Sequence, residues 1–378
     1  MTAEEGSKYD AIVVGVGGVG SAVVYELARR GKNVLGLERY DIPHSRGSSH
    51  GQTRIIRRAY HEHPQYMAMI DRAYDYWERL EDECGEQLLF KTGSVAAGPA
   101  ASDLVSGARR TCEVHSIPHE RIGGAEASER FPGFTLPEEY EVVYQADGGF
   151  VRPEAATVAH VRLARELGAT VETETEVTDW RSTRNGVQVT TENGRYEADR
   201  LVVAAGPWLG KVVDSLASAV SPERQVLSWF RPKRAEDFAP ETHPVFLVSD
   251  GEDIHYGFPT YGRPGVKFGR HYHLRERIDP DGMDREATAH DEAILAEAAG
   301  RYLAVDADEP LGFETCIYTN TADRDFIVDT LPNHSDVVVL GGFSGHGYKF
   351  AGVLGELGAE LASGEEPSLD IGPFAIGR

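Results

Sequence analysis

Short runs of apolar and β-branched residues recur along the chain and predict buried strands, the first of them at Tyr9 to Val14. A glycine-rich turn follows this run, and the residues after it predict a helix that ends at about Arg30. Asn33 to Leu37 repeats the strand pattern. The chain therefore opens with a strand, a helix and a second strand, the order in which many nucleotide-binding domains begin.

Strands and helices continue to alternate in the middle of the chain. Helices are predicted over Tyr66 to Cys84 and over Pro153 to Leu167, the second with proline near its first turn. Thr170 to Thr191 predicts two strands joined by a turn at Asn185-Gly186. Two short apolar strands and a closing helix complete the pattern: Arg200 to Ala204, residues 336 to 341, and roughly Lys349 to Ala362.

Residues 221 to 280 differ from the rest, because they carry strand patterns and little sign of helix. They interrupt the nucleotide-type strands, which occur at the beginning, in the middle and near the end of the chain. This distribution predicts a mixed α/β (α+β) protein in which two domains share the chain discontinuously. One is a Rossmann-like domain and the other an interleaved domain rich in β-sheet, with a site expected where they meet.

Composition narrows the class of protein. Hydrophobic residues make up 41% of the 378 residues, and no apolar run approaches membrane-spanning length, which indicates a soluble globular protein. Met1 to Asp10 is short and polar and lacks the layout of a signal peptide, so a cytoplasmic location is expected. The three cysteines, Cys84, Cys112 and Cys316, are too few for a disulfide framework and leave one free for chemistry.

The formal net charge is −23, from 61 acidic and 38 basic residues. A surface of this sign repels nucleic acid and anionic lipid. The acidic residues are dispersed, without a single acidic tail, and lysine is scarce. We therefore hypothesise a solvated surface suited to high salt, as in halophilic organisms.

A glycine-rich motif directly follows the first strand. The residues GVGGVG match G-x-G-x-x-G, with glycines at Gly15, Gly17, Gly18 and Gly20. Glycines here allow backbone N–H groups to approach a pyrophosphate, whose charge the helix N-terminus favours. Glu38 ends the next strand, at the distance where an acid holds ribose hydroxyls. The motif predicts a dinucleotide site but does not separate NAD from FAD.

Five later blocks of sequence decide between these cofactors. They are GSSHGQTRIIR at 47–57, YGFP at 256–259, GRH at 269–271, TCIYT at 315–319 and GGFSGHGYKF at 341–350. In this order, and over nearly the whole chain, they resemble the monomeric sarcosine oxidase and N-methyltryptophan oxidase family of D-amino-acid-oxidase-like flavoproteins. The resemblance implies a flavoprotein that binds FAD.

The resemblance also implies how the two domains divide the work. An FAD-binding domain is expected from residues 1–80, 150–215 and 310–378. A substrate and catalytic domain is expected from residues 81–149 and 216–309.

In that family FAD is attached covalently by a cysteine thioether to the flavin 8-methyl group, and Cys316 stands at this position. Attachment needs a thiolate near the electron-poor edge of the flavin, and cationic neighbours favour the thiolate. No metal site is predicted. The resemblance places six further residues in contact with the cofactor: Ser48, Arg57, Val177, Trp208, Gly345 and His346.

For the substrate, the resemblance assigns the carboxylate to Arg54, paired with Lys349 across the pocket and supported by Arg57. A guanidinium suits this role because it presents a fixed planar pair of donors. Lys267 matches a lysine near flavin N5 that assists the reaction with O2, where a cation stabilises developing negative charge. Three other residues match positions in the substrate pocket: Tyr256, His271 and Tyr318.

The implied activity is oxidation of a small secondary (N-methyl) amino acid such as sarcosine. It comprises hydride transfer to flavin N5, hydrolysis of the imine, and reduction of O2 to hydrogen peroxide. The expected partners are the amino acid and O2, without nucleic acid or membrane, for a monomer or small homo-oligomer. Three alternatives stay open: a flavin dehydrogenase that uses an electron carrier, a flavin-binding subunit of a larger complex, and an NAD-dependent dehydrogenase.

Some positions depart from the pattern of the sarcosine oxidases. Ser49 stands where histidine is usual, and Gln52 replaces an acid. The residues after His271, Tyr-His-Leu-Arg, are bulkier and more basic than the small residues usual there. The sequence therefore leaves the substrate open among N-methylglycine, larger N-methyl amino acids, and cyclic or glycated ones.

Overall fold

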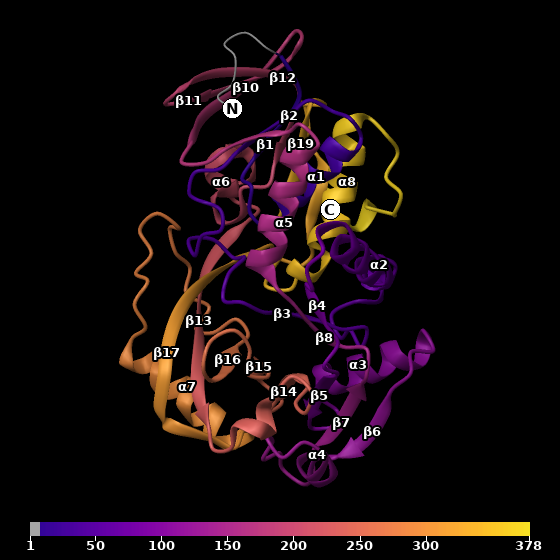
Figure 1. The fold of residues 1–378 in the computed structure, drawn as a ribbon, viewed down its shortest axis with the longest axis vertical. Helices are drawn as coiled ribbons and strands as arrows, with labels where there is room; N and C mark the ends of the chain where they lie inside the picture. The colour runs from indigo at the N-terminus through magenta and orange to yellow at the C-terminus, as the bar shows by residue number, and fades with distance from the viewer. Residues whose placement is uncertain (1–7) are drawn as a thin grey trace.

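The structure is a computed structural model that describes residues 8–378, so the polar stretch predicted at Met1 to Asp10 lies largely outside the described residues. One sheet with its helices occupies the upper half of the molecule and a second sheet the lower half (Figure 1). Two long strands of the second sheet, β13 (Ser221–Pro232) and β17 (Val305–Asn320), extend upward toward the first.

The first sheet has a parallel centre in the order β19-β12-β1-β2-β9, as the predicted Rossmann-like domain requires. β1, β2 and β19 are apolar and buried along nearly their whole length, because both faces of a parallel sheet are covered. The strands of this sheet are β1 (Tyr9–Val14), β2 (Val34–Leu37), β9 (Thr170–Glu172), β10 (Val177–Thr183), β11 (Gly186–Thr191), β12 (Gly194–Val203), β18 (Ile327–Thr330) and β19 (Val337–Gly341).

The segment Thr170 to Thr191 contains three strands where the sequence predicted two. β10 and β11 form the predicted antiparallel hairpin, which turns at Asn185-Gly186. β9 is separate and lies parallel to β2 at the edge of the sheet. Glu174, between β9 and β10, has a left-handed φ of +52°, and this turn ends β9 and redirects the chain.

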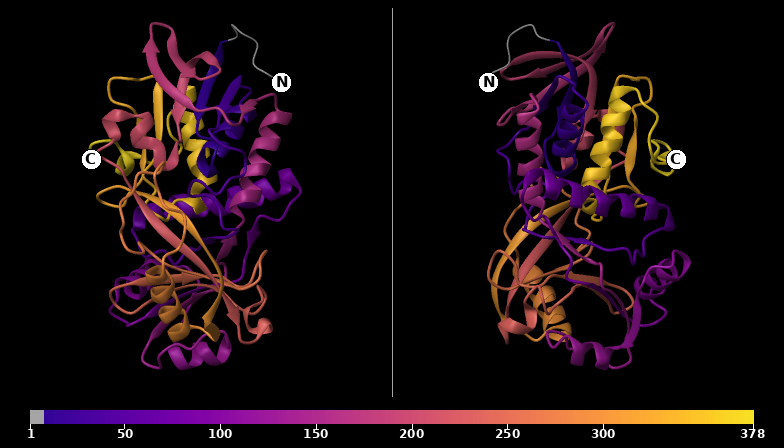
Figure 2. Two further views of the ribbon diagram at one scale, coloured as in Figure 1. Left: turned by 90° about the vertical axis from the view of Figure 1, so that its left-hand side faces the viewer. Right: turned by 45° about the vertical axis from the view of Figure 1, so that its right-hand side comes forward.

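Helix α1 (Gly18–Arg29) packs against both α5 (Pro153–Glu166) and α8 (Ala351–Ser363), and Figure 2 shows the three beside the first sheet. α1 and α8 approach closely because glycine faces alanine: a Cβ added to Gly355 would lie 2.5 Å from the Ala22 methyl group. The predicted final helix starts slightly late, since residues Tyr348–Phe350 form a 3-10 turn before α8.

The second sheet follows the order β17-β13-β16-β15-β14-β5-β7-β6 and is mostly antiparallel. α7 (Ala289–Tyr302) packs on β13, β16 and β17, while α3 (Asp103–Val114) packs on β5 and β7. No helix was predicted from the sequence at α3, at α7 or at the short helix α4 (Gly124–Arg130). Besides β13 and β17, the sheet contains β5 (Ser94–Gly98), β6 (Glu120–Gly123), β7 (Glu141–Gln145), β14 (Val245–Ser249), β15 (Ile254–Gly257) and β16 (Val266–Arg270).

A third, small sheet lies between the two larger ones, with β3 (Arg54–Ile56), β8 (Gly149–Val151) and β4 (Leu89–Phe90) in that order. Above it runs α2 (Met67–Cys84), which begins one residue later than the helix predicted from Tyr66. The short helices are α4 (Gly124–Arg130) and α6 (Leu209–Val212). Within residues 8–378, no helix combines the length and apolar character needed to cross a bilayer.

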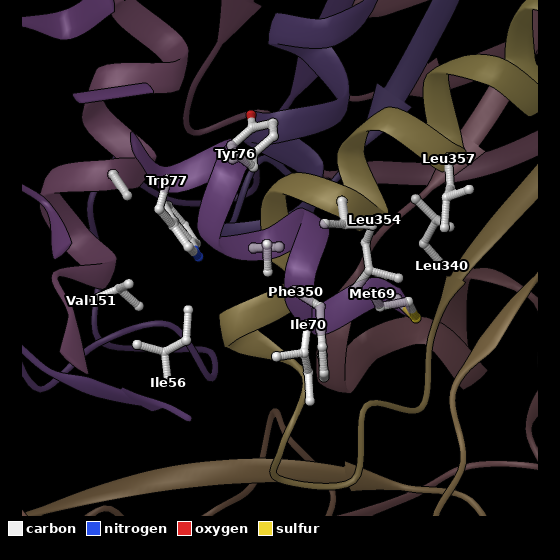
Figure 3. Packing of buried hydrophobic residues seen from close by; sticks show 14 of the residues in the cluster. Ile56, Met69, Ile70, Tyr76, Trp77, Val151, Leu340, Phe350, Leu354 and Leu357 are labelled. Atoms are coloured by element: carbon white, nitrogen blue, oxygen red, sulfur yellow. The ribbon is translucent and has the colours of Figure 1, made fainter. Parts of the chain in front are cut away.

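The hydrophobic core beneath the site is formed largely by α2 and α8 (Figure 3). Trp77 is fully buried in this core, and its indole Nε1 donates a hydrogen bond of 2.9 Å to the backbone oxygen of Lys349. Phe350, next in the chain, is also fully buried. This core therefore fixes the backbone of the predicted substrate-binding Lys349 from two sides.

Candidate cofactor cleft and substrate chamber

A cavity of about 460 Å³ opens at the carboxyl ends of the parallel strands β1, β2, β12 and β19. Ligands of open α/β sheets bind at this edge, because the loops that leave the strands diverge there. Most of the predicted cofactor residues line the cavity: Gly15, Gly17, Gly18, Glu38, Ser48, Val177, Trp208 and Gly345. Segments distant in sequence thus converge on one cleft.

The glycines of the motif have two different roles: some are required by the turn itself, and one leaves room for a ligand. Gly15 has a φ of +85°, and a Cβ on Gly20 would lie 1.8 Å from the Gly15 oxygen, so the turn itself requires glycine at both positions. A Cβ on Gly17, which caps α1, would meet no protein atom within 4 Å. The space beside Gly17 belongs to the cavity, at the positive end of a helix. These residues fit the pyrophosphate of FAD.

Glu38 is 5% exposed and is held at the cavity wall by the glycine-rich turn. Its carboxylate accepts hydrogen bonds from the backbone N–H of Val16 at 2.8 Å and of Tyr40 at 3.0 Å. Trp208 lies at the same outer end, where its Nε1 donates to Asp281 at 2.8 Å. The acid at the end of β2 is therefore fixed in the position expected for a ribose contact.

Cys316 lies behind the cavity wall and is 2% exposed. Its Sγ is 3.7 Å from Nη2 of Arg54 and 3.8 Å from the backbone oxygen of Ser48. Burial opposes ionisation of the thiol, but His50, Arg54 and Lys267 outweigh it and lower the pKa of Cys316 to about 7. A substantial thiolate fraction therefore exists at neutral pH, beside a loop that lines the cofactor cleft.

Lys267 is deeply buried and its ammonium group is surrounded by backbone. Nζ donates to the oxygens of Gly51 at 2.7 Å and Thr53 at 2.9 Å, and to the Thr53 hydroxyl at 3.2 Å. Burial, and then Arg54, lower the pKa of Lys267. The three oxygens stabilise the charged form of the amine and so act against this lowering, although the Thr53 hydroxyl can also donate to a neutral amine.

A group of side chains next to the cofactor cleft, which we call the substrate chamber after its proposed role, comprises Arg57, Tyr256, His271, Tyr318 and Lys349. His271 Nδ1 is 3.3 Å from the Tyr318 hydroxyl, and burial lowers the pKa of His271 to about 3, so the imidazole is neutral at physiological pH. Tyr318 lies against the loop after β19, since a Cβ on Gly345 would be 2.3 Å from its ring. Tyr256 is nearby, on β15, with its ring against Gly269 of β16.

Lys349 and Arg57 lie at another side of the chamber. The Arg57 guanidinium contacts both oxygens of Glu62 at 3.0 Å and Nδ1 of His61 at 2.8 Å. Lys349 Nζ donates to the His346 oxygen at 2.5 Å and lies 5.0 Å from the ring centre of Tyr60. Burial, and then the charge of Arg57, lower the pKa of Lys349 to about 7.

The neighbours of the two arginines differ from the expected pairing. Lys349 is close enough to be influenced by the charge of Arg57, whereas Arg54 lies with Cys316 and Lys267. Arg54 begins β3 and Arg57 directly follows it, and side chains three positions apart on an extended chain point to opposite sides. The structure thus moves Arg57 to the chamber and Arg54 to the side of the predicted flavin linkage.

His346, predicted at the cofactor, is not among the residues that line the cavity and lies near Glu62, Lys349 and Arg57. Its Nδ1 is 2.5 Å from the Tyr60 hydroxyl and its Nε2 is 3.0 Å from the Arg324 oxygen. Burial lowers the pKa of His346 to about 4, which makes the ring neutral. Sequence reasoning did not identify Tyr60 and Glu62, although both directly follow the matched block that ends at Arg57.

Comparisons with known proteins agree with this geometry. A family model described as FAD dependent oxidoreductase matches residues 10–361. Over 375 residues the chain is 37% identical to monomeric sarcosine oxidase from Bacillus sp. (strain NS-129), covering 98% of this chain and 97% of that protein. It is 35% identical to N-methyl-L-tryptophan oxidase from Salmonella agona (strain SL483), covering 98% of this chain and 99% of that one.

Among solved structures, NikD, an unusual amino acid oxidase essential for nikkomycin biosynthesis, matches with a TM-score of 0.85. The two chains are 27% identical, and the match covers 98% of this chain and 97% of NikD. Similarity of this extent, with the glycine-rich turn and the cleft in place, confirms the resemblance found in the sequence. The chain belongs to the FAD dependent oxidoreductase family, among relatives that include monomeric sarcosine oxidases and N-methyl-L-tryptophan oxidases.

Proposed function

We propose that this protein is an FAD-dependent oxidase of N-methyl amino acids such as sarcosine. The observation that carries the proposal is that the buried side chains Arg57 and Lys349 lie beside the cofactor cleft, near His271 and Tyr318. A carboxylate, a secondary amine and a small alkyl group match these surroundings. The activities named for the sarcosine and N-methyl-L-tryptophan oxidases support the same substrate class.

The side chains bind and orient the amino acid. Arg57 offers a planar pair of donors to the substrate carboxylate once its present partner, Glu62, moves aside, and Lys349 adds a second charge. His271 and Tyr318 are neutral and contact the amine of the substrate. They therefore do not oppose the loss of the amine proton. FAD, when bound in the cleft, accepts the hydride. The protein contributes position and the exclusion of water.

We propose covalent attachment of FAD through Cys316. A lowered thiol pKa, three cationic neighbours and a place beside the cofactor cleft support this linkage. The Ser48 loop and β17, which carries both Cys316 and Tyr318, contribute to the cavity lining. The two sheets support a division into an FAD-binding and a substrate domain, but β17 belongs to the second sheet, so the predicted boundary at residue 310 falls inside a strand.

We propose O2 as the electron acceptor, with Lys267 as the cation that stabilises charge on the reduced oxygen. The three hydrogen bonds that favour protonated Lys267 support this role. A flavin dehydrogenase that uses a carrier, or a subunit dependent on a complex, would share the same fold. Membership in an FAD-dependent family removes the NAD-dependent alternative.

The test is an aerobic assay of the purified holoenzyme with N-methylglycine, glycine and N-methyl-L-tryptophan, in which hydrogen peroxide and O2 uptake are both measured. Equal amounts of peroxide formed and O2 consumed with an N-methyl substrate, and little with glycine, support the oxidase. Flavin bleaching without peroxide would indicate a dehydrogenase. No bleaching by any N-methyl amino acid would contradict the proposed substrate class.

We also propose that the dispersed acidic surface adapts the protein to high salt. The net charge of −23 creates self-repulsion that dissolved salt screens. We expect the melting temperature and activity to rise from low to molar KCl. Highest stability at low salt would contradict this proposal.

A further inference from the structure

Tyr272 occupies a notable position directly after the chamber residue His271. Its ring centre is 4.0 Å from that of His271, and its ring meets that of Tyr318 edge-on at 5.9 Å. Its hydroxyl donates a hydrogen bond of 3.0 Å to the backbone oxygen of Ser344, in the loop that lines the cofactor cleft. Tyr272 thus joins the chamber wall to the cofactor loop.

The ring of Tyr272 lies between the chamber residues His271 and Tyr318 and the guanidinium of Arg324. The residue is partly exposed, and the guanidinium of Arg324 covers its ring at 4.2 Å. Burial raises the pKa of Tyr272, and the charge of Glu62 raises it further, so the phenol lies near the same Glu62 that holds Arg57. The ring of Tyr272 therefore extends from His271 and Tyr318 toward Glu62, the partner of Arg57.

The backbone holds this ring in place against local strain. Tyr272, Arg324 and Ser344 have φ values of +55°, +70° and +48°, the left-handed region that such residues rarely adopt. The next residue, His273, anchors the segment, because its backbone N–H donates to Gln225 at 3.0 Å. Its Nε2 lies 2.7 Å from the fully buried Asp291. Three strained residues that contact one another indicate a conformation maintained by its surroundings.

We propose that Tyr272 is a specificity-determining residue that limits the size of the substituent on the α-carbon of the substrate. Arg57 and Lys349 fix the carboxylate, and the ring of Tyr272 fills the space into which a bulky side chain would extend. Small secondary amino acids fit beneath this ring, and those with an aromatic side chain clash with it. The inference rests on the proposed function, because it assumes that the chamber binds an N-methyl amino acid.

The experiment compares kcat/KM for N-methylglycine and N-methyl-L-phenylalanine in the holoenzyme. Tyr272→Gly removes the ring and suits the left-handed backbone, whereas Tyr272→Phe keeps the ring and loses only the hydrogen bond to Ser344. Ser116→Gly is the matched control, since Ser116 also has a left-handed φ, +53°, in an exposed turn after α3. Thermal melting of each variant reports whether it folds.

We expect Tyr272→Gly to raise the preference for the bulky substrate about tenfold or more, while Tyr272→Phe and Ser116→Gly leave it near the wild-type value. An unchanged preference in Tyr272→Gly, or a wild-type enzyme that already accepts both substrates equally, overturns the inference. If Tyr272→Gly does not fold, Tyr272→Asn serves, because asparagine also tolerates this backbone. Failure of the wild type to oxidise either substrate contradicts the proposed function instead, so the two failures are distinguishable.

Discussion

The protein holds two arginine–lysine pairs in different surroundings, and the contrast indicates different tasks. Lys267 lies with Arg54, and its amine is enclosed by backbone and hydroxyl oxygens. Arg54 likewise donates to the backbone oxygens of Ser48 and Thr53. Backbone acceptors cannot leave, so this pair is a fixed source of positive potential.

In the second pair, Arg57 can exchange its partners. Arg57 is held by the side chains of Glu62 and His61, whereas Lys349 donates to the backbone oxygen of His346 and keeps that partner. Side chains can rotate away and yield their place to a substrate carboxylate. Fixed acceptors suit charge stabilisation beside a permanent cofactor, whereas movable acceptors suit a ligand that must enter and leave. Five experiments test this comparison, from the largest expected effect to the smallest.

Replacement of Cys316 by alanine should abolish the covalent link on the fixed side completely. After acid precipitation, the yellow colour should remain with the wild-type pellet and leave the Cys316→Ala pellet, and the wild-type mass should exceed the chain mass by that of one FAD. Cys112→Ala is the control, because Cys112 is also fully buried but burial raises its pKa to about 11. Colour retained by the Cys316→Ala pellet would place the linkage elsewhere.

Lys267→Met should slow the reaction with O2 by roughly 10²–10³-fold, the range for loss of one well-placed charge-stabilising donor. Anaerobic bleaching by N-methylglycine should change little, because Lys267 does not lie at the chamber. Stopped-flow absorbance separates the two half-reactions. If flavin bleaching became slower while the reaction with O2 stayed normal, Lys267 would act in substrate oxidation. The contrast between the two arginine–lysine pairs would then not hold.

Arg57→Gln should raise KM for N-methylglycine about tenfold or more, the effect of losing a hydrogen bond to a charged group worth roughly 1.5–3 kcal/mol. Flavin content should stay at the wild-type level. Arg54→Gln should show the opposite pattern, in which the flavin content falls more than KM rises, because Arg54 contacts Cys316. If Arg57→Gln lost flavin while Arg54→Gln only raised KM, the assignment of the arginines would be reversed.

The pH dependence of carboxylate binding should report the charge of Lys349. Its pKa is lowered to about 7, so the amine is charged below this pH and neutral above it. The dissociation constant of propionate, which has no amine to titrate, should therefore rise severalfold as pH increases through about 7. Titration of the flavin spectrum measures it. Lys349→Met should bind propionate weakly and without this dependence, and a persistent dependence would implicate another group.

Glu62→Gln should have the smallest effect of the five. Loss of the competing carboxylate frees Arg57, so we expect KM to fall a few-fold with kcat nearly unchanged. The exchange is nearly isosteric and retains one acceptor for the guanidinium. A rise in KM would show that Glu62 holds Arg57 in its working position rather than competing with the substrate.

Periodicity and motif spacing predicted much of the fold. The strand, glycine turn and helix at the start appear as β1 and α1, and the hairpin at Asn185-Gly186 joins β10 and β11. The helices α3 and α7 were not predicted, and α7 shows why. Its N-terminus carries a local signal that was overlooked, because Thr288 and Asp291 form a capping box. Asp291 also binds Arg224 and His273 from elsewhere in the chain, and these long-range partners leave no local pattern.

The residues of the site were also predicted only in part from the sequence. Sequence blocks identified Gly15, Glu38 and Cys316, whose roles depend on short motifs with fixed spacing. They did not identify Glu62 as the partner of Arg57, or Tyr272 as a wall of the chamber. Both residues look like ordinary surface-compatible side chains in the sequence. Glu62 lies only five residues from Arg57, but nothing in the local sequence marks the pair, and Tyr272 contacts Ser344, 72 residues away.

The sequence by itself determined the family, the dinucleotide motif and the set of chemical groups available, because backbone conformation at glycines and the spacing of a motif are local properties. Tertiary structure alone decided which arginine accompanies which lysine. Arg54 and Arg57 are nearly neighbours in the chain, yet the alternation of an extended strand sends their side chains to opposite sides. Burial and the charge of Arg57 lower the pKa of Lys349 to about 7, whereas the cationic neighbours of Cys316 lower its pKa to about 7 against the effect of burial.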